Sequence, residues 1–306
     1  MARHVRFHTT GGPEVLQIDD VPTPEPKAGE VRISVRALGL NRAESMYRSG
    51  RYVIEPSFPA TMGYEASGVI DAVGQGVSNL AVGDAVAVIP AFMFDQYGLY
   101  GDLVIAPARA VVKNPAGVSW EAAAATWMPF TTAWGALIDL AGLGKGDFVV
   151  LSAASSSVGL AAMQIAESVG ATPIAITRNG EKLDDLKKAG FAHVLQTGLD
   201  DITAEILRIT GGAGARVVFD PVGGPEFEHI VKATSKDAIV HLWRTEPRHH
   251  AGPGAARSGQ AHHDPRLRIH RGHCRRRKTC PCQGIHHRRL ERWDVQASDC
   301  QGLPVR

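Results

Sequence analysis

The chain has 306 residues, enough for two domains, and its formal net charge is only +2. No apolar run has the length of a membrane-spanning helix, and the N-terminus lacks the hydrophobic stretch of a signal peptide. Residues 1–240 also contain no Cys. We therefore expect a cytoplasmic protein without a membrane partner.

The average charge hides a break near residue 240. Residues 241–306 hold 13 Arg and 1 Lys against 5 acidic residues, a net charge of +9, whereas residues 1–240 carry a net charge of −7. All 4 Cys and 9 of the 13 His lie after residue 240. The first part has the composition of a globular protein and the basic tail does not.

The N-terminal part has the pattern of a β-rich domain. Short alternating or apolar runs at residues 31–35, 67–73 and 85–89 are separated by Gly and Pro. This spacing predicts a partly open barrel, which we assign to residues 1–122. Ser119 is the expected N-cap of a helix that begins at residue 120.

From residue 123 onward, helical patterns alternate with short apolar strands. The expected strands cover residues 148–151, 174–176, 193–195 and 215–219, and the expected helices cover residues 160–169, 181–189 and 202–210. Alternation of this kind predicts an α/β fold with a doubly wound parallel sheet. We assign this second domain to residues 123–240.

The turn between the first of these strands and its helix contains only small side chains before Val158. It ends in Ser155, Ser156, Ser157, Val158 and Gly159. Such a turn directs backbone N–H groups and the positive end of the helix dipole at one place, which suits a pyrophosphate. Only the last glycine of the usual fingerprint GxGxxG is present, so an ordinary strand–helix unit without a ligand stays an alternative.

The end of the following strand distinguishes between the two nicotinamide cofactors. Proteins that bind NADH place Asp or Glu here to hold the ribose 2′-hydroxyl. This chain instead has Thr177 and Arg178, with Lys182 in the next helix. A hydroxyl and two cations fit a 2′-phosphate, so we expect NADPH. The alternative is that both cations belong to the solvated start of a helix.

Five segments together point to a family. They are residues 11–52, 63–88 (GYEASGVIDAVGQGVSNLAVGDAVAV), 122–137 (AAAATWMPFTTAWGAL), 153–166 (AASSSVGLAAMQIA) and 219–224 (FDPVGG). Through them, residues 1–240 resemble the medium-chain dehydrogenase/reductase superfamily, specifically its zinc-free quinone oxidoreductase branch. The resemblance implies a GroES-like catalytic domain followed by a Rossmann domain that binds NADPH.

The sequence departs from the zinc-dependent alcohol dehydrogenase branch at the metal ligands. That branch has a Cys ligand soon after the third strand and a Gly-His-Glu motif. Here residues 40–44 contain no Cys, and Gly63-Tyr64-Glu65 has Tyr in place of the ligand His. Catalytic zinc needs three protein ligands, and Glu65 alone cannot hold the ion. We therefore expect no metal.

Without zinc, the resemblance implies hydride transfer from NADPH to a quinone or an enone, in which the developing negative charge is delocalised. A hydrogen-bond donor at the carbonyl oxygen contributes about 2–4 kcal/mol. The resemblance places Asn41 and Tyr52 beside the nicotinamide, with Tyr52 as donor and Asn41 orienting substrate or ribose. It also places Thr132 near the nicotinamide amide and Asp220 at the cofactor edge of the sheet.

Each of these four residues also has a plainer interpretation. Asn41 is equally typical of a turn, and Tyr52 of a loop aromatic that packs on a neighbour. Thr132 fits the start of a helix, and Asp220 fits a strand-end turn. For the function, the alternatives are an enoyl or alkenal reductase with the same machinery, and a non-catalytic protein that binds NADPH or nucleic acid.

The basic tail, residues 241–306, allows three hypotheses. A nucleic-acid arm would use Arg275, Arg276 and Arg277, but this run lacks interleaved aromatic residues, so we expect no nucleic-acid partner. A metal site is poorly supported because Cys280-Pro281-Cys282 has the wrong ligand spacing. The third hypothesis is a reading-frame error, which leaves the Rossmann domain truncated and the tail disordered.

The genetic code supports the frame hypothesis. Read one base downstream, codons allowed for residues 277–306 can spell an ordinary amphipathic helix, a turn and a strand, and those for residues 241–250 can spell IYGALSPDTT. The resemblance implies that the segment after residue 240 supplies the fifth and sixth strands of the cofactor sheet. Without them, the strand at residues 217–219 would be an unprotected edge.

We predict that a form with the frame restored near Ala238 is soluble, homodimeric and able to oxidise NADPH with a benzoquinone, whereas this chain folds poorly and is largely inactive. The reason is the loss of sheet strands to a charged tail. The measurement is side-by-side expression, size-exclusion chromatography and NADPH consumption. Equal solubility and activity of the two forms would contradict the frame hypothesis.

Overall fold

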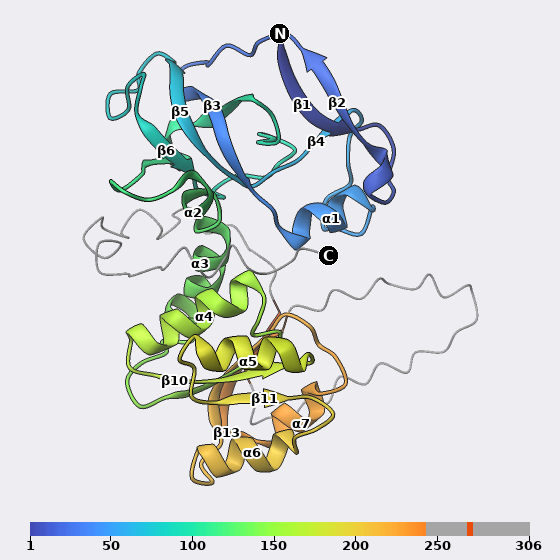
Figure 1. The fold of residues 1–306 in the computed structure, drawn as a ribbon, viewed down its shortest axis with the longest axis vertical. Coiled ribbons are helices and arrows are strands. Elements are labelled where there is room, and N and C mark those ends of the chain that lie inside the picture. The colour runs from blue at the N-terminus through green and yellow to red at the C-terminus, as the bar shows by residue number, and fades with distance from the viewer. Residues whose placement is uncertain (243–267, 272–306) are drawn as a thin grey trace. The chain divides into compact units, whose positions relative to one another are not determined.

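The computed structural model describes residues 1–242 and 268–271. The chain divides into two compact units, the first over Met1–Met128 and the second beginning at Pro129. The first unit is β-rich and the second alternates strands and helices, as expected (Figure 1). The boundary expected after residue 122 lies inside a short helix, α2 (Trp120–Ala124), whereas the compact units separate at Met128.

The first unit contains two antiparallel sheets. The larger has the strand order β7-β3-β5-β6-β8, formed by β3 (Glu30–Gly39), β5 (Glu65–Val73), β6 (Ala85–Val88), β7 (Leu103–Pro107) and β8 (Val111–Lys113). The smaller has the order β2-β1-β4, formed by β1 (Ala2–Phe7), β2 (Leu16–Val21) and β4 (Ala60–Thr61). Short helices join them: η1 (Pro13–Val15), α1 (Arg42–Arg48), η2 (Ala108–Ala110) and α2.

The strands of the larger sheet follow the expected alternation of buried and outward side chains. Val31 and Ile33 of β3 are fully buried in a core with Val86 and Val104. Residues at alternate positions of a strand point to opposite faces, so the residue between Val31 and Ile33 points away from this core. That residue is Arg32, which is half-buried.

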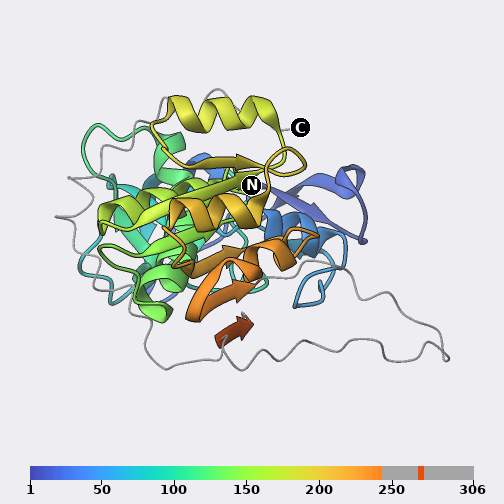
Figure 2. The same ribbon diagram turned by 90° about the horizontal axis from the view of Figure 1, so that it is seen from below.

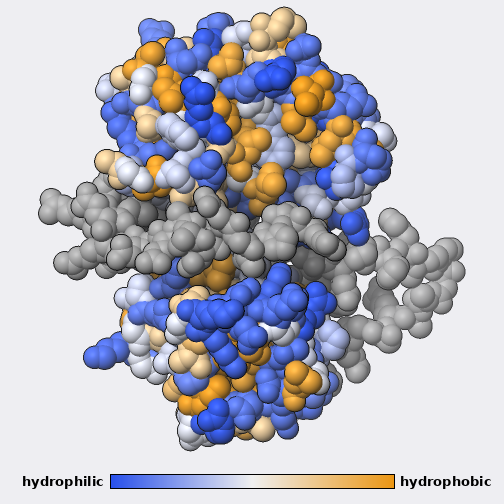
Figure 3. All heavy atoms as spheres, in the orientation of Figure 1, coloured by the Kyte–Doolittle hydropathy of each residue, from blue (hydrophilic) through white to orange (hydrophobic). Residues whose placement is uncertain are grey.

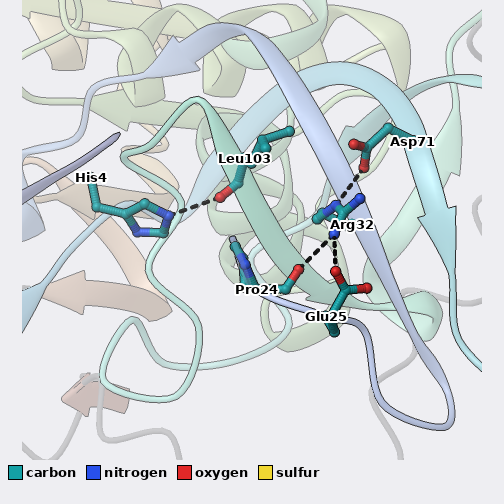
Figure 4. A network of polar contacts seen from close by, with 6 residues as sticks. All are labelled: His4, Pro24, Glu25, Arg32, Asp71 and Leu103. Atoms are coloured by element: carbon teal, nitrogen blue, oxygen red, sulfur yellow. Dashed lines mark hydrogen bonds and ion pairs between the residues drawn. The ribbon is translucent and has the colours of Figure 1, made fainter. Parts of the chain in front are cut away.

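Arg32 on β3 forms hydrogen bonds to β5 and to the segment that precedes β3 (Figure 4). Its Nε donates to Asp71 Oδ1 on β5 at 2.9 Å, and its Nη1 donates to the oxygens Pro24 O and Glu25 Oε1 at 2.9 Å. Asp71 lies at a register shift of the β3–β5 pair, which explains its approach to Arg32. Hydrogen bonding to Asp71 raises the pKa of Arg32 above its usual range.

The second unit contains a parallel sheet with the order β11-β10-β9-β12-β13-β14. The strands are β9 (Phe148–Leu151), β10 (Thr172–Thr177), β11 (Val194–Gln196), β12 (Ala215–Asp220), β13 (Thr234–Leu242) and β14 (Arg268–Arg271). In chain order this is third, second, first, fourth, fifth, sixth, the order of the dinucleotide-binding fold. The expected α/β fold with a GroES-like and a Rossmann part is therefore confirmed.

Helices cover this sheet and lead into it. They are α3 (Trp127–Trp134), the π-helix η3 (Gly135–Leu140), α4 (Ser157–Ser168), α5 (Gly180–Lys188), α6 (Ile202–Ile209) and α7 (Phe227–Lys232). Figure 1 shows α5 and α6 on opposite sides of β11, and Figure 2 shows the same layers from below. The central strand β9 is apolar throughout because both of its faces are covered: Val149, Val150 and Leu151 are all fully buried.

The expectation that residues 217–219 would be an unprotected edge is wrong. β12 lies between β9 and β13, and β13 itself pairs with β14. The fifth strand was missed because Lys236 and Asp237 interrupt its apolar pattern. The structure accommodates them at a register shift where Asp237 has a φ of +62°, and pairing with β12 resumes at Ile239.

Within the tail that was expected to be disordered, the described residues Arg268–Arg271 form the parallel strand β14. All six strands of the cofactor sheet are therefore present in the described part of the chain. A lack of sheet strands is therefore no longer a reason to expect that this chain is inactive. The rest of the tail, and with it the frame hypothesis, lies outside the described residues.

The described surface mixes hydrophilic residues with scattered hydrophobic ones (Figure 3). Exposed apolar side chains include Ile18, Leu40, Val53 and Leu199, and isolated ones of this kind are ordinary on protein surfaces. Over residues 1–242 and 268–271, no helix combines the length and hydrophobicity needed to cross a membrane.

Candidate functional site

The turn between β9 and α4 has the geometry of a phosphate-binding turn. Ser156 is the N-cap of α4, and its Oγ accepts a hydrogen bond from the Gly159 N–H at 3.1 Å. A Cβ on Gly159 would lie 2.5 Å from Ala154 O, so only glycine fits there. Ala153 has a φ of +48°, a conformation that non-glycine residues adopt rarely. The remaining first-turn N–H groups of α4 lack helical acceptors and suit an anion.

The residues expected to select NADPH lie beside this turn, because β10 pairs with β9 in parallel. Thr177, the last residue of β10, is buried, whereas Arg178 is exposed and Lys182 is half-buried in the first turn of α5. Within the described part of the chain, neither cation forms an ion pair. Both charges are therefore available to an anionic group at this edge.

The side chain of Asp220 forms hydrogen bonds within the turn that follows β12. The residue is 2% exposed, and its Oδ1 accepts the N–H groups of Val222 at 2.9 Å and Gly223 at 3.1 Å. The hydroxyl of Ser152, at the end of β9, donates to the same oxygen. These contacts favour the strand-end-turn interpretation of Asp220 and add Ser152, which sequence reasoning missed.

In the first unit, Asn41 connects two buried carboxylates. It is the N-cap of α1, and its backbone N–H donates to Glu44 Oε2 at 2.6 Å. Its side-chain Nδ2 donates to Glu65 Oε1 at 3.1 Å. Glu44 and Glu65 are 3% and 2% exposed. The Asn41 side chain is thus fixed by the chain itself, as a helix cap would be.

Glu44 accepts hydrogen bonds from residues in three parts of the first unit. Besides Asn41, it accepts the Tyr64 N–H at 3.1 Å and the Tyr100 hydroxyl at 2.7 Å. All three donors are neutral, and burial raises the pKa of Glu44. Gly63 makes this arrangement possible: its φ is +110°, and a Cβ there would lie 2.5 Å from the Tyr100 ring. Sequence reasoning missed Glu44 and Tyr100, since no local pattern links residues so far apart.

Glu65 anchors the beginning of α3. Its Oε2 accepts the Met128 N–H at 2.8 Å, and the Trp127 N–H also bonds to this carboxylate. Burial and the nearby Glu44 charge together raise the pKa of Glu65 to about 7, against the opposing hydrogen bonds from Met128 and Asn41. Glu65 therefore titrates close to neutral pH, and its proton is held more tightly in the folded chain than in the unfolded one.

Tyr52 lies in the irregular segment between α1 and β4, and its hydroxyl is 3.2 Å from the Tyr64 hydroxyl. Tyr52 is half-buried, whereas Tyr64 is 4% exposed. The two rings pack against Phe94, with centroid distances of 5.5 Å and 4.3 Å. The packing interpretation of Tyr52 and its role as a hydroxyl donor are thus compatible.

The structure brings Asn41 and Tyr52 into one network through Tyr64 and Glu44. Thr132 lies in the other unit, half-buried on α3. Over residues 1–242 and 268–271, no group of three His, Cys, Asp or Glu side chains is close enough to hold a metal ion.

Comparisons with known proteins agree with this architecture. Residues 27–116 match the alcohol dehydrogenase GroES-like domain family, and residues 157–243 match the zinc-binding dehydrogenase family. Quinone oxidoreductase 1 of Escherichia coli is 33% identical over 242 residues, which cover 78% of this chain and 72% of that protein.

Solved structures give the same result. The structure of Escherichia coli quinone oxidoreductase complexed with NADPH matches with a TM-score of 0.71 and 30% identity, covering 79% of this chain and 72% of that one. The CurK enoyl reductase matches with a TM-score of 0.72 and 27% identity, covering 79% and 73%. The two units define a nicotinamide-dependent dehydrogenase of the medium-chain type. Within that superfamily, the chain belongs to the quinone oxidoreductases.

Replacing Glu65 by Gln is expected to remove a pH dependence of stability. Because the pKa of Glu65 is raised from 4.5 to about 7 on folding, its contribution to stability is fully present below pH 4.5 and lost as the pH rises through about 7. The Glu65→Gln variant should therefore gain about 2–3 kcal/mol relative to the parent between these limits.

The measurement is urea unfolding of both forms at pH 4.5, 6 and 8. The control is Glu55→Gln, which alters an exposed carboxylate in the same unit. A constant difference between parent and Glu65→Gln at all three pH values would contradict the assignment.

We also predict less than stoichiometric zinc in the purified protein, since Tyr64 replaces the ligand His and Glu65 is engaged by Asn41 and Met128. Elemental analysis measures this directly. Zinc held by residues 1–240, with activity lost on chelation, would show that the ligand argument is wrong.

Proposed function

We propose that this chain is a zinc-independent oxidoreductase that transfers hydride from NADPH to a quinone. The observation that carries the proposal is the edge of the parallel sheet, where the N-terminus of α4 lies beside the end of β10 and its two cations, which form no ion pair among the described residues. Membership of the quinone oxidoreductases supports both the cofactor and the reaction.

The residues at this edge fit NADPH. Ser155, Ser156, Ser157, Val158 and Gly159 would hold the pyrophosphate through backbone N–H groups, and the close approach at Gly159 keeps the turn tight. Thr177, Arg178 and Lys182 would hold the 2′-phosphate. Asp220 would support this edge through the turn it fixes. When bound, NADPH supplies the hydride.

The first unit supplies groups for the acceptor. Reduction of a carbonyl places negative charge on its oxygen, and the Tyr52 hydroxyl would stabilise that oxygen by about 2–4 kcal/mol. Asn41 would act from a fixed orientation, since both buried carboxylates engage it. Thr132 would contact the nicotinamide amide from α3.

The alternative acceptor is an enone, as in an enoyl or alkenal reductase. The similarity to the CurK enoyl reductase favours it, since reduction of a conjugated carbonyl uses the same donor at the same oxygen. A panel with a benzoquinone, a 2-alkenal and an enoyl thioester, followed by NADPH absorbance, separates the two. The expected result is the highest kcat/KM with the quinone.

The proposal also covers the location, the assembly and the partners of the enzyme. We propose a cytoplasmic enzyme, a homodimer if the reading frame is restored, and no nucleic-acid partner. Size-exclusion chromatography with light scattering tests the assembly.

We predict that the parent binds NADPH more tightly than NADH and that Arg178→Ala weakens NADPH binding by about 1.5–3 kcal/mol, the range for a charge-assisted contact. NADH binding should stay within twofold, because NADH has no 2′-phosphate. Fluorescence titration with both cofactors measures this. The control is Lys187→Ala, which removes an exposed cation from the last turn of the same helix. Equal affinity of the parent for NADPH and NADH would rule the assignment out.

A further inference from the structure

We propose that Tyr64 is a positioning residue: its hydroxyl donates to Tyr52 Oη and so leaves the Tyr52 hydrogen for the acceptor's carbonyl oxygen. The inference rests on the proposed function, in which Tyr52 is the donor to that oxygen. It adds a role for a residue that sequence reasoning treated only as a lost metal ligand.

The number of hydroxyl hydrogens limits what the Tyr52–Tyr64 pair can do. Each hydroxyl has one hydrogen, so only one member of the Tyr52–Tyr64 pair donates across their 3.2 Å separation. If Tyr52 donated to Tyr64, no hydrogen would remain for a substrate. If Tyr64 donates, the Tyr52 hydrogen is free to point elsewhere and its donor strength increases, because hydrogen bonds in a chain polarise one another.

The second hydrogen-bond partner of the Tyr64 hydroxyl competes weakly. This hydroxyl is also positioned to donate to Met93 Sδ at 3.5 Å, but a thioether sulfur is a weak acceptor. The phenolic oxygen of Tyr52 is the better acceptor, so the Tyr64 hydrogen points to Tyr52. Acceptor strength therefore favours the orientation that leaves Tyr52 as the outward donor.

Tyr64 is the fixed member of the pair. Its side chain is buried, its ring packs on Phe94, and its backbone N–H is bonded to Glu44. Tyr52 is half-buried and lies outside any helix or strand. The hydroxyl of Tyr52 thus takes its position from Tyr64.

Tyr64 is also kept in its protonated form. Burial raises the pKa of Tyr64 well above its usual range, and the hydrogen bond with Tyr52 acts in the same direction, as do the nearby carboxylates Glu44 and Asp95. A neutral hydroxyl at this place is a permanent donor. It does not exchange its proton during the reaction, and its effect is on the direction of the Tyr52 hydrogen.

The test is a double-mutant cycle in the full chain with Tyr52→Phe, Tyr64→Phe and both together. Each change removes one hydroxyl and keeps the ring. We expect Tyr64→Phe to lower kcat for a benzoquinone by about 3- to 10-fold, the loss from one neutral hydrogen bond. The KM for the quinone and the Kd for NADPH should stay within twofold. In the Tyr52→Phe background, Tyr64→Phe should have no further effect.

The control is Met93→Leu, which removes the sulfur acceptor and keeps most of the side-chain volume. It should leave kcat within twofold of the parent. A loss of kcat with Met93→Leu equal to that with Tyr64→Phe would identify the sulfur as the true partner and overturn the inference. A purely structural role for Tyr64 would change KM and NADPH affinity as well, and would also overturn it.

The failure of the inference differs from the failure of the proposed function. If the kcat losses of Tyr52→Phe and Tyr64→Phe multiply in the double variant, only the role of Tyr64 is overturned. A parent chain that binds NADPH but reduces no quinone, or a Tyr52→Phe variant with full turnover, overturns the role of Tyr52 and the inference together.

Discussion

The carboxylate of Glu44 organises the part of the first unit on which the proposed chemistry depends. Its two oxygens accept hydrogen bonds from Asn41, Tyr64 and Tyr100, which come from three separate segments. A buried carboxylate without a cation is costly, and these donors offset the cost only while all of them stay in place. The same contacts fix the backbone of Tyr64, which in turn sets the position of the Tyr52 hydroxyl.

Glu65 extends this arrangement to the beginning of α3. It bonds to Asn41 on one oxygen and to the Met128 N–H of the helix on the other. In the zinc-dependent alcohol dehydrogenase branch, from which this sequence departs, the corresponding motif serves the metal. Here the same place holds a carboxylate that caps a helix and a tyrosine that contacts another hydroxyl, so these polar groups are satisfied within the chain.

The second unit depends on a different constraint, the burial of both faces of a parallel sheet. Its central strands are short apolar runs, and their carboxyl ends meet at one edge. The β9–α4 turn, the end of β10 and the Asp220 turn therefore lie on adjacent strands although they are far apart in the sequence. This explains why each motif alone is weak and their combination is informative.

The sequence by itself determined the strands with continuous or alternating apolar patterns, such as β9 and β12, and the small-residue turn before α4, because these signals are local. It did not predict β13, where Lys236 and Asp237 break the pattern and only pairing with β12 restores a strand. It named Asn41 and Tyr52 through resemblance, but their partners are a matter of tertiary structure. Glu44, Tyr64 and Tyr100 meet because chain folding buries them together, and a hydrogen bond across such a sequence distance leaves no periodic signal.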